Sequence, residues 1–312
     1  MENPVGLRER KTHLLSILSR GLGKPSLRLA ELGVILEASP VDLKRVAAVI
    51  RSDAELTARL RLLTSDALSA EGRRIHRLED ALILLGAAEI RNLALACHLI
   101  EASRESLNSA TTEVFWKHAL AVAFLSGRAA RGLGLGSAEQ AYVGGLLHDA
   151  GKLPLLMVAE AERSSAAIWL CCDGGKTLVL EREYFGLDHT EAGRRLGLQW
   201  KLAPALVEAM TWHHEPRRAR QATDLAGIIA IVNRFRASRP STDASLSEDF
   251  VRDCLPHVGE ISRKALLAIL RREYPHAREN AESENHSLVG QIDAPQPSAL
   301  TASEGAAKMN VL

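Results

Sequence analysis

The chain has 312 residues, of which 46% are hydrophobic and 25% are charged, with 39 Lys and Arg residues against 38 Asp and Glu residues. This is the composition of a globular protein of one large or two modest domains, and a formal net charge of +1 gives no field that would favour nucleic acid or an anionic membrane. The polar start Met1–Pro4 and the short apolar runs predict neither a signal sequence nor a membrane helix. We therefore expect a cytoplasmic protein with no nucleic-acid or membrane partner.

The first half of the chain shows helical spacing of apolar residues almost throughout. The segments predicted to be helical are an N-terminal helix or arm within 1–25, 26–39, a helix that begins at Pro40, 56–63, and the pair 78–85 and 90–100 divided by Gly86. A polar interval over 101–112 is interpreted as a connection between two lobes. No stretch shows the alternating pattern of a strand, which predicts an all-α protein.

The second half places a histidine on a core-facing helix position and a His-Asp pair at a helix end. The helix predicted from about 112 to 131 directs His118 toward the core, and a helix capped by Ser137 ends at His148 and Asp149. Neighbouring helical side chains point about 100° apart, so this pair can hold one metal ion only beyond the helix terminus. An isolated pair of this kind is more often a hydrogen-bonded helix end, so partners elsewhere must decide.

The residues after the pair predict a sharp stop. Gly151 offers a left-handed position that closes the helix, and Pro154 is expected to prevent its restart. The longer apolar run that follows, from Leu155 to residue 172, predicts another helix.

Further polar groups lie at predicted helix ends. A capping box begins at Asp188 and places His189 at a helix N-terminus, and the helix opened by Pro204 ends with His213 and His214. Asn233 lies on the apolar face of the helix predicted from residue 224 to about 236. After a polar loop over 240–247 and final helices over 250–274, the sequence loses its periodicity, so a disordered tail is expected. The domains predicted are an arm (1–25), an N-terminal lobe (26–110), an HD-like helical lobe (111–275) and a tail (276–312).

Motifs in both halves resemble one family. The run Leu-Leu-His148-Asp149-Ala-Gly-Lys152-Leu, together with Trp116-Lys117-His118-Ala119, Asp188-His189-Thr-Glu-Ala-Gly and His213-His214-Glu-Pro, resembles the HD superfamily, and more narrowly its HD-related output domain family, HDOD. The N-terminal runs 53–65 and 81–94 resemble the same family's first half. The resemblance covers about residues 25–275.

The resemblance implies an all-helical, two-lobed protein related to metal-dependent phosphohydrolases and to the phosphodiesterases that open cyclic di-GMP. In such enzymes the matching positions are metal ligands, while output-domain members act mostly as signalling modules. Neutral imidazole and carboxylate are good ligands for Mn, Fe, Ni or Zn. The metal positions implied here are His118, His148, Asp149, His189, His213, His214 and Asn233. Lys152 would lie near a departing phosphate in an active enzyme, although a lysine after a helix end more often complements the helix dipole.

Asn233 stands where the resemblance implies a closing aspartate. An amide oxygen can ligate a metal but brings no negative charge, and one unit charge at about 4 Å is worth roughly 4 kcal/mol at an effective dielectric near 20. In a site without metal, the amide could instead donate to Asp149. We therefore predict a non-catalytic regulatory module whose degenerate metal site is either free of metal or holds a divalent ion without activity, and which acts through protein partners in trans or through ligand binding. A metal-dependent phosphodiesterase is the alternative, and the sequence gives no oligomeric state.

Overall fold

The computed structural model of the chain describes residues 6–22, 27–38, 40–54, 56–58, 78–171, 177–237 and 246–289. All regular structure in these ranges is helical, which confirms the all-α prediction. The predicted helix over 56–63 and the predicted loop over 240–247 lie largely outside them. The elements are α1 (Leu7–Arg20), α2 (Leu27–Glu37), α3 (Leu43–Arg51), α5 (Leu78–Ser106), α6 (Ser109–Leu133), α7 (Ala138–Leu147), α8 (Lys152–Ala161), α9 (Ala166–Leu170), α10 (Thr177–Phe185), α11 (His189–Gln199), α12 (Pro204–Trp212), the 3-10 helix η1 (Pro216–Arg218), α13 (Thr223–Ala237), α14 (Glu248–Cys254) and α15 (Glu260–Val289).

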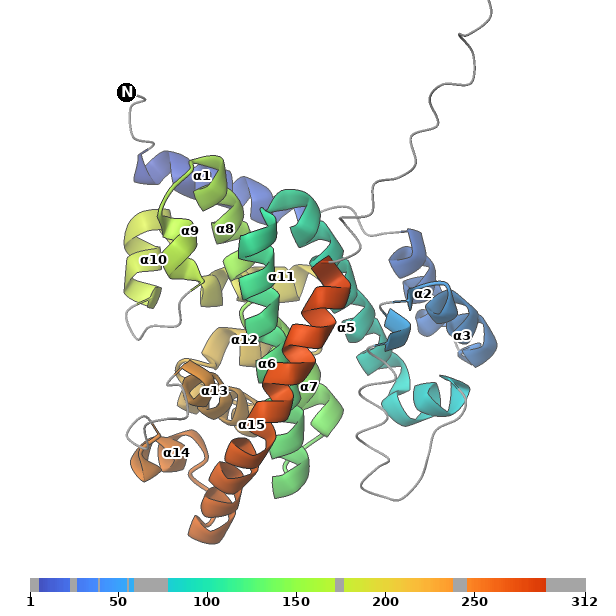
Figure 1. The fold of residues 1–312 in the computed structure, drawn as a ribbon. Coiled ribbons are helices and arrows are strands. Elements are labelled where there is room, and N and C mark those ends of the chain that lie inside the picture. Colours follow the sequence, from blue (N-terminus) through green and yellow to red (C-terminus); the bar gives the residue numbers. More distant parts are fainter. Residues whose placement is uncertain are drawn as a thin grey trace, which may run out of the picture.

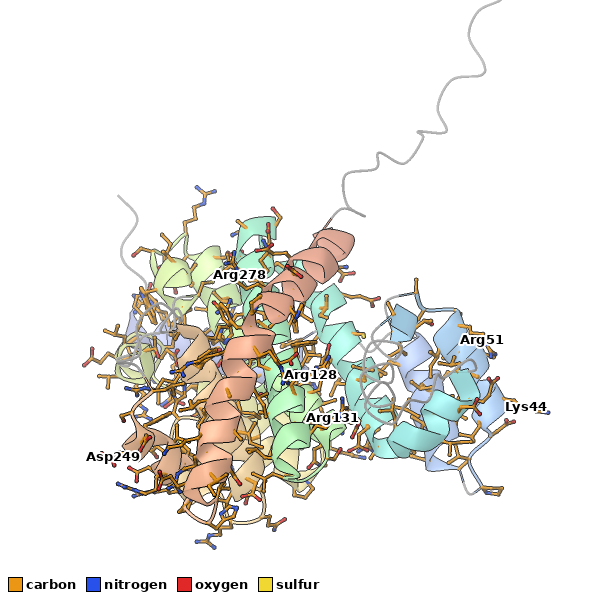
Figure 2. The ribbon with its side chains drawn as sticks, turned by 60° about the horizontal axis from the view of Figure 1, so that its bottom comes forward. Lys44, Arg51, Arg128, Arg131, Asp249 and Arg278 are labelled. Atoms are coloured by element: carbon orange, nitrogen blue, oxygen red, sulfur yellow. The ribbon has the colours of Figure 1, made fainter. Side chains whose placement is uncertain are left out.

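Two groups of helices of unequal size are joined by α5 (Figure 1). The smaller group contains α2 and α3 against the first part of α5, with Lys44 and Arg51 on its outer side (Figure 2). In the larger group α6 is central and contacts α7, α13 and α15. Helix α5 bends at Gly86, whose φ of 78° ends one helical segment and begins the next. This is the division that the sequence predicted.

The connection between the lobes is shorter than the polar interval 101–112 suggested. Helix α5 continues to Ser106, and only Leu107 and Asn108 separate it from α6. The Asn108 side chain caps α6 by accepting from the backbone N–H of Thr111 at 2.9 Å. Polar residues therefore form the exposed end of one helix and the cap of the next. Within the described ranges, no helix has the length and apolar content needed to cross a membrane.

Helix α1 packs into the larger group, although the sequence suggested an arm. It contacts α8, α10 and α11, and it buries Leu14, Ile17 and Leu18. Arg10 forms an ion pair with Glu162 at 3.0 Å. The N-terminal segment thus covers the helices that carry part of the candidate site.

Helix α15 runs to Val289, so the prediction of a disordered tail is wrong for residues 276–289. Leu266, Leu270, Ala277 and Ala281 are buried at spacings of four, seven and four residues, which places them on one helical face. Helix α15 lies along α6 (Figure 1). The second half of its buried face is made of alanines, and such small residues give little hydrophobic signal in the sequence. Residues 290–312 lie outside the described ranges.

Gly151 has a right-handed conformation, with φ −65° and ψ −16°, so the predicted left-handed stop is wrong. Helix α8 begins directly after it, with Pro154 in the first turn, where a proline needs no N–H partner. The glycine is needed for a different reason, because a Cβ at this position would lie 1.9 Å from the backbone oxygen of His189 and 2.4 Å from the backbone N of Gly193. The start of α8 therefore packs directly on α11.

Substitution of Gly151 by alanine is expected to destabilise the protein by about 3 kcal/mol or more, because backbone on both sides must move. Urea unfolding followed by circular dichroism measures this. Gly33→Ala is the matched control: Gly33 lies within α2 with no atom close to the added Cβ. That change should raise the free energy of unfolding by roughly 0.5–1 kcal/mol. Equal effects of the two changes would contradict the close approach of α8 and α11.

Candidate metal centre

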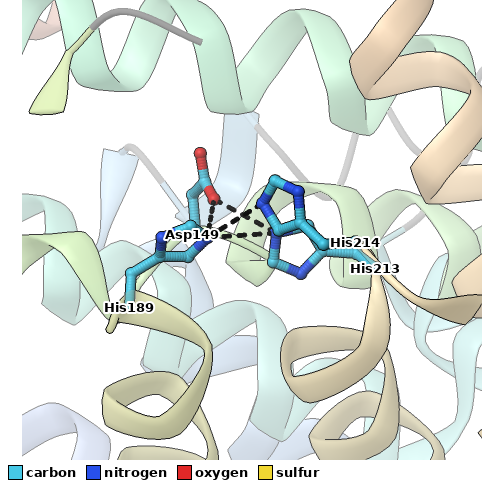
Figure 3. A group of neighbouring side chains, drawn as sticks. All are labelled: Asp149, His189, His213 and His214. Atoms are coloured by element: carbon cyan, nitrogen blue, oxygen red, sulfur yellow. Dashed lines mark hydrogen bonds and ion pairs between the residues drawn. The ribbon is translucent and has the colours of Figure 1, made fainter. Parts of the chain in front are cut away.

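Six of the predicted residues meet at one place in the larger group of helices. They form two overlapping sets that share Asp149, and in each set the potential ligand atoms lie within 4.8 Å of one another. The first set is His118, His148 and Asp149, and the second is Asp149, His189, His213 and His214. Figure 3 shows the second set around the carboxylate. The role of these residues as metal ligands remains a prediction.

Helix ends supply most of the cluster. His148 and Asp149 follow the last residue of α7, which begins at its Ser137 cap as predicted. His189 is the first residue of α11, where the Asp188 side chain accepts from the N–H of Glu191 at 2.9 Å. His213 and His214 directly follow α12, and His118 lies within α6. The capping signals therefore located these side chains correctly along their helices.

One oxygen of Asp149 faces the first set. Its Oδ2 lies 3.5 Å from Nε2 of His118 and 3.4 Å from Nε2 of His148. These two imidazole nitrogens are 3.3 Å apart. The ammonium of Lys152, from the first turn of α8, lies 2.7 Å from the same oxygen. A full positive charge therefore already contacts this side of the carboxylate.

The other oxygen faces the second set. Oδ1 of Asp149 lies 3.3 Å from Nε2 of His189 and 3.5 Å from Nε2 of His213. Nε2 of His189 is 3.3 Å from Nε2 of His213 and 3.2 Å from Nε2 of His214. Asp149 thus separates two groups of imidazoles, one on each oxygen.

The cluster is closed to solvent except at one residue. Asp149 is 1% exposed, and His148 and His189 are fully buried, whereas His214 is exposed. Apart from the ion pair between Lys152 and Oδ2, the oxygens of Asp149 have no hydrogen-bond partner. Buried acceptors without hydrogen bonds are rare in folded proteins, because they lose their hydration without replacement. This side chain therefore needs compensation by a cation.

Contacts on the far side of the rings fix the direction of three imidazoles. Nδ1 of His148 lies 2.7 Å from the carbonyl oxygen of Gly145, and Nδ1 of His213 lies 3.1 Å from that of Met210. Nδ1 of His189 lies 2.8 Å from Glu181. Because these oxygens can only accept, each Nδ1 carries the hydrogen, and Nε2 of a neutral ring presents its lone pair to the cluster.

Glu181 is a site residue that the sequence analysis missed. Its side chain is fully buried, and it accepts from the backbone N–H of His189 at 2.7 Å as well as from the ring. It lies on α10 between Thr177 and Phe185, the other buried residues of that helix, at spacings of four. The signal in the sequence that could have identified Glu181 was an acidic residue at a position of the helix that faces the core. Carboxylates that orient a histidine in this way are common beside metal ligands.

The charges in the cluster shift several pKa values. Burial opposes ionisation of Asp149, but His148 and Lys152 hold the pKa of this carboxyl well below its usual range. Burial is the main cause that lowers the pKa of His213 to about 4, so this ring is neutral at physiological pH. Burial also opposes the charged form of His189, but the Glu181 carboxylate outweighs it and raises the pKa of His189 above 6.5.

Asn233 is buried on α13, and its Oδ1 has no hydrogen-bond partner. The hydrogen bond expected from its amide to Asp149 is not formed. The positive charge of Lys152 compensates Asp149 instead. A lysine at this position therefore contacts the cluster rather than the end of α7.

The donor set fits a divalent ion. Two ligands held about 2.0–2.1 Å from one ion at a tetrahedral angle are separated by about 3.4 Å. The distances of 3.2–3.5 Å among the imidazole nitrogens and Asp149 oxygens match this separation. Imidazole nitrogen and carboxylate oxygen suit Zn, Fe, Ni and Mn. The residues therefore fit the ions expected from the sequence.

The pair of Glu181 and His189 predicts a pH-dependent stability in a chelator. A raised histidine pKa contributes stability that is fully present below about pH 6.5 and is lost as the pH rises through the folded pKa. Glu181→Gln should therefore cost more near pH 6, about 3 kcal/mol, than near pH 9. Urea unfolding in EDTA measures the difference, with the exposed neighbour Glu183→Gln as control. A cost for Glu181→Gln that is the same at both pH values would contradict the charged pair.

Comparisons with known proteins agree with the fold. The model of the HDOD domain matches residues 25–216. A solved structure described as "Putative phosphohydrolase", from Shewanella amazonensis, is 22% identical, with a TM-score of 0.64 over 89% of this chain and 100% of that one. An HDOD domain protein with unknown function from Geobacter sulfurreducens is 20% identical, with a TM-score of 0.58 over 89% and 99%. A "Putative signal transduction protein" from Marinobacter aquaeolei is 17% identical, with a TM-score of 0.57 over 93% and 67%. No curated protein matches the chain.

Proposed function

The chain belongs to the HDOD family, as its sequence motifs predicted, and we propose from this membership that it is a non-catalytic output module of bacterial signal transduction. It acts through a regulatory protein partner in trans, and its HD-like centre has a structural or regulatory role. One solved structure of similar fold is described as a signal transduction protein, which is compatible with this role.

The burial of the centre is the observation that carries the proposal. A phosphoester that is hydrolysed at a metal must reach an open coordination position. Here the residues around Asp149 are 0–8% exposed, and only His214 reaches the surface. A substrate the size of a nucleotide would have to displace packed helix ends to reach the carboxylate.

The charges favour the same function. Asn233 stands where the resemblance implies a closing aspartate, and Lys152 contacts the carboxylate of Asp149. A bound divalent ion would supply an activated water and polarise a phosphoryl oxygen. The chain's own residues do not favour that chemistry: Asp149 is already paired with an ammonium, and Asn233 cannot act as a general base.

A metal-dependent phosphohydrolase is the second candidate. The retention of five histidines and one aspartate in a single cluster favours it, as does the description of one structure of similar fold as a phosphohydrolase. The two functions differ in whether the loaded protein turns over a phosphoester.

Hydrolysis assays on protein loaded with Mn²⁺, Fe²⁺, Ni²⁺ or Zn²⁺ test the proposal. Bis(p-nitrophenyl) phosphate and cyclic di-GMP are the substrates, and His148→Ala and Asp149→Ala are the matched variants. We expect the wild type to release product no faster than either variant. Metal-dependent turnover that both substitutions abolish, with folding verified by circular dichroism, would establish the phosphohydrolase instead.

A further inference from the structure

We propose that the two sides of the centre are built differently. Arg236 and Lys152 take the place of one cation beside His118 and His148, so the cluster binds a single divalent ion beside His189. This inference rests on the proposed regulatory function, because it explains how the protein's own hydrogen bonds and charges replace a metal ion in one half of the centre.

Arg236 fixes the proton on His118. It lies on α13, one turn after Asn233, and its Nη1 is 2.5 Å from Nδ1 of His118. A guanidinium group has only donors, so Nδ1 of His118 must accept. A neutral imidazole then carries its hydrogen on Nε2. His118 therefore directs an N–H, and not a lone pair, toward the cluster.

A continuous set of hydrogen bonds follows from this proton. Nε2 of His118 lies 3.3 Å from Nε2 of His148 and donates to it. His148 can accept there because its Nδ1 donates to the carbonyl oxygen of Gly145. Each ring has one donor and one acceptor in use, so this half of the cluster is complete without metal.

Lys152 occupies the remaining position on this side. Its ammonium contacts Oδ2 of Asp149 at 2.7 Å, where a metal ion would otherwise meet the carboxylate. A metal ion here would have to displace Lys152 and move the His118 proton to a nitrogen that faces Arg236. Asn233 adds no negative charge to offset either change.

On the opposite side, neutral imidazoles have no comparable set of hydrogen bonds among themselves. When both rings are neutral, Nε2 of His189 and Nε2 of His213 present lone pairs, because their Nδ1 atoms donate to Glu181 and to Met210. These lone pairs are 3.3 Å apart and face Oδ1 of Asp149. Acceptors this close repel one another unless a proton on His189 or a metal ion lies between them, and only a metal ion can contact all of these acceptors at once.

His214 completes the ligand set on that side. Its Nε2 lies 3.2 Å from Nε2 of His189. Three imidazoles and one carboxylate then make four protein ligands, which is the closed set of a structural site, whereas catalytic zinc sites leave one position to water. A single ion held in this way would lock the ends of α7, α11 and α12 together.

Metal stoichiometry tests the inference. Full-length protein is stripped with a chelator, loaded with excess Zn²⁺ or Mn²⁺, freed of unbound metal by gel filtration and measured by inductively coupled plasma mass spectrometry. We expect one ion per chain, and the Mn²⁺ form should give the paramagnetic resonance spectrum of an isolated ion. Two ions per chain, a coupled spectrum, or no bound ion would overturn the inference.

Variants assign the ion to one side. His118→Ala should keep the ion, and so should the control His276→Ala, which removes an exposed histidine on α15. His189→Ala should lose it, and Glu181→Gln should weaken binding about 10-fold to 100-fold. If His189→Ala does not fold, His214→Ala replaces it, because that side chain is exposed. An ion lost with His118→Ala but kept without His189 or His214 would contradict the assignment.

A variant that removes the two cations and introduces an aspartate at position 233 gives the strongest test. The triple variant Lys152→Met, Asn233→Asp, Arg236→Ala should bind a second ion, because His118 can then present a lone pair beside a second carboxylate. A triple variant that folds and still binds one ion would show that Arg236 and Lys152 do not exclude the second. Two ions in the wild type without phosphoester turnover refute only this inference. Turnover with one bound ion refutes the proposed function and leaves the stoichiometry standing.

Discussion

The buried carboxylate of Asp149 is the group on which the centre depends. It cannot be solvated, so its charge must be met by protein cations, by protons or by a metal ion. Lys152 contacts one oxygen, and the imidazoles of His189 and His213 face the other. A single short turn provides both the carboxylate and its ammonium partner, because α8 begins three residues after Asp149. The absence of a side chain at Gly151 then brings this turn against the start of α11, where His189 lies.

Much of the site could be predicted because it is made from helix ends, and helix ends have local signals. A capping serine or aspartate or an N-terminal proline depends only on nearby backbone, so Ser137, Asp188 and Pro204 indicated where helices begin. The burial of His118 followed from the apolar face of α6. The family motifs join these positions, and the HDOD match confirms the resemblance on which the grouping was based.

The remaining features depend on groups that are distant in the sequence. Gly151 has the conformation of any helical residue, and only the backbone of α11 explains why it has no side chain. Arg236 is 118 residues from the histidine that it contacts, so no spacing could assign its role. The last part of α15 was missed because alanines cover α6 there, and they lack the large side chains by which an amphipathic face is recognised.

The charge balance explains why the two sides of the cluster should not be equivalent. Asp149 and Glu181 carry the negative charges, while Lys152 and Arg236 carry positive ones, and all four contact the imidazoles or one another. When the imidazoles are neutral, every divalent ion therefore adds two positive charges to a buried group that already has no net charge. The first ion can be bound by the imidazoles on the His189 side, where it replaces the proton that Glu181 favours on His189. A second would meet Lys152 and Arg236 in a medium that screens poorly, and an aspartate at position 233 is the group that would have offset it.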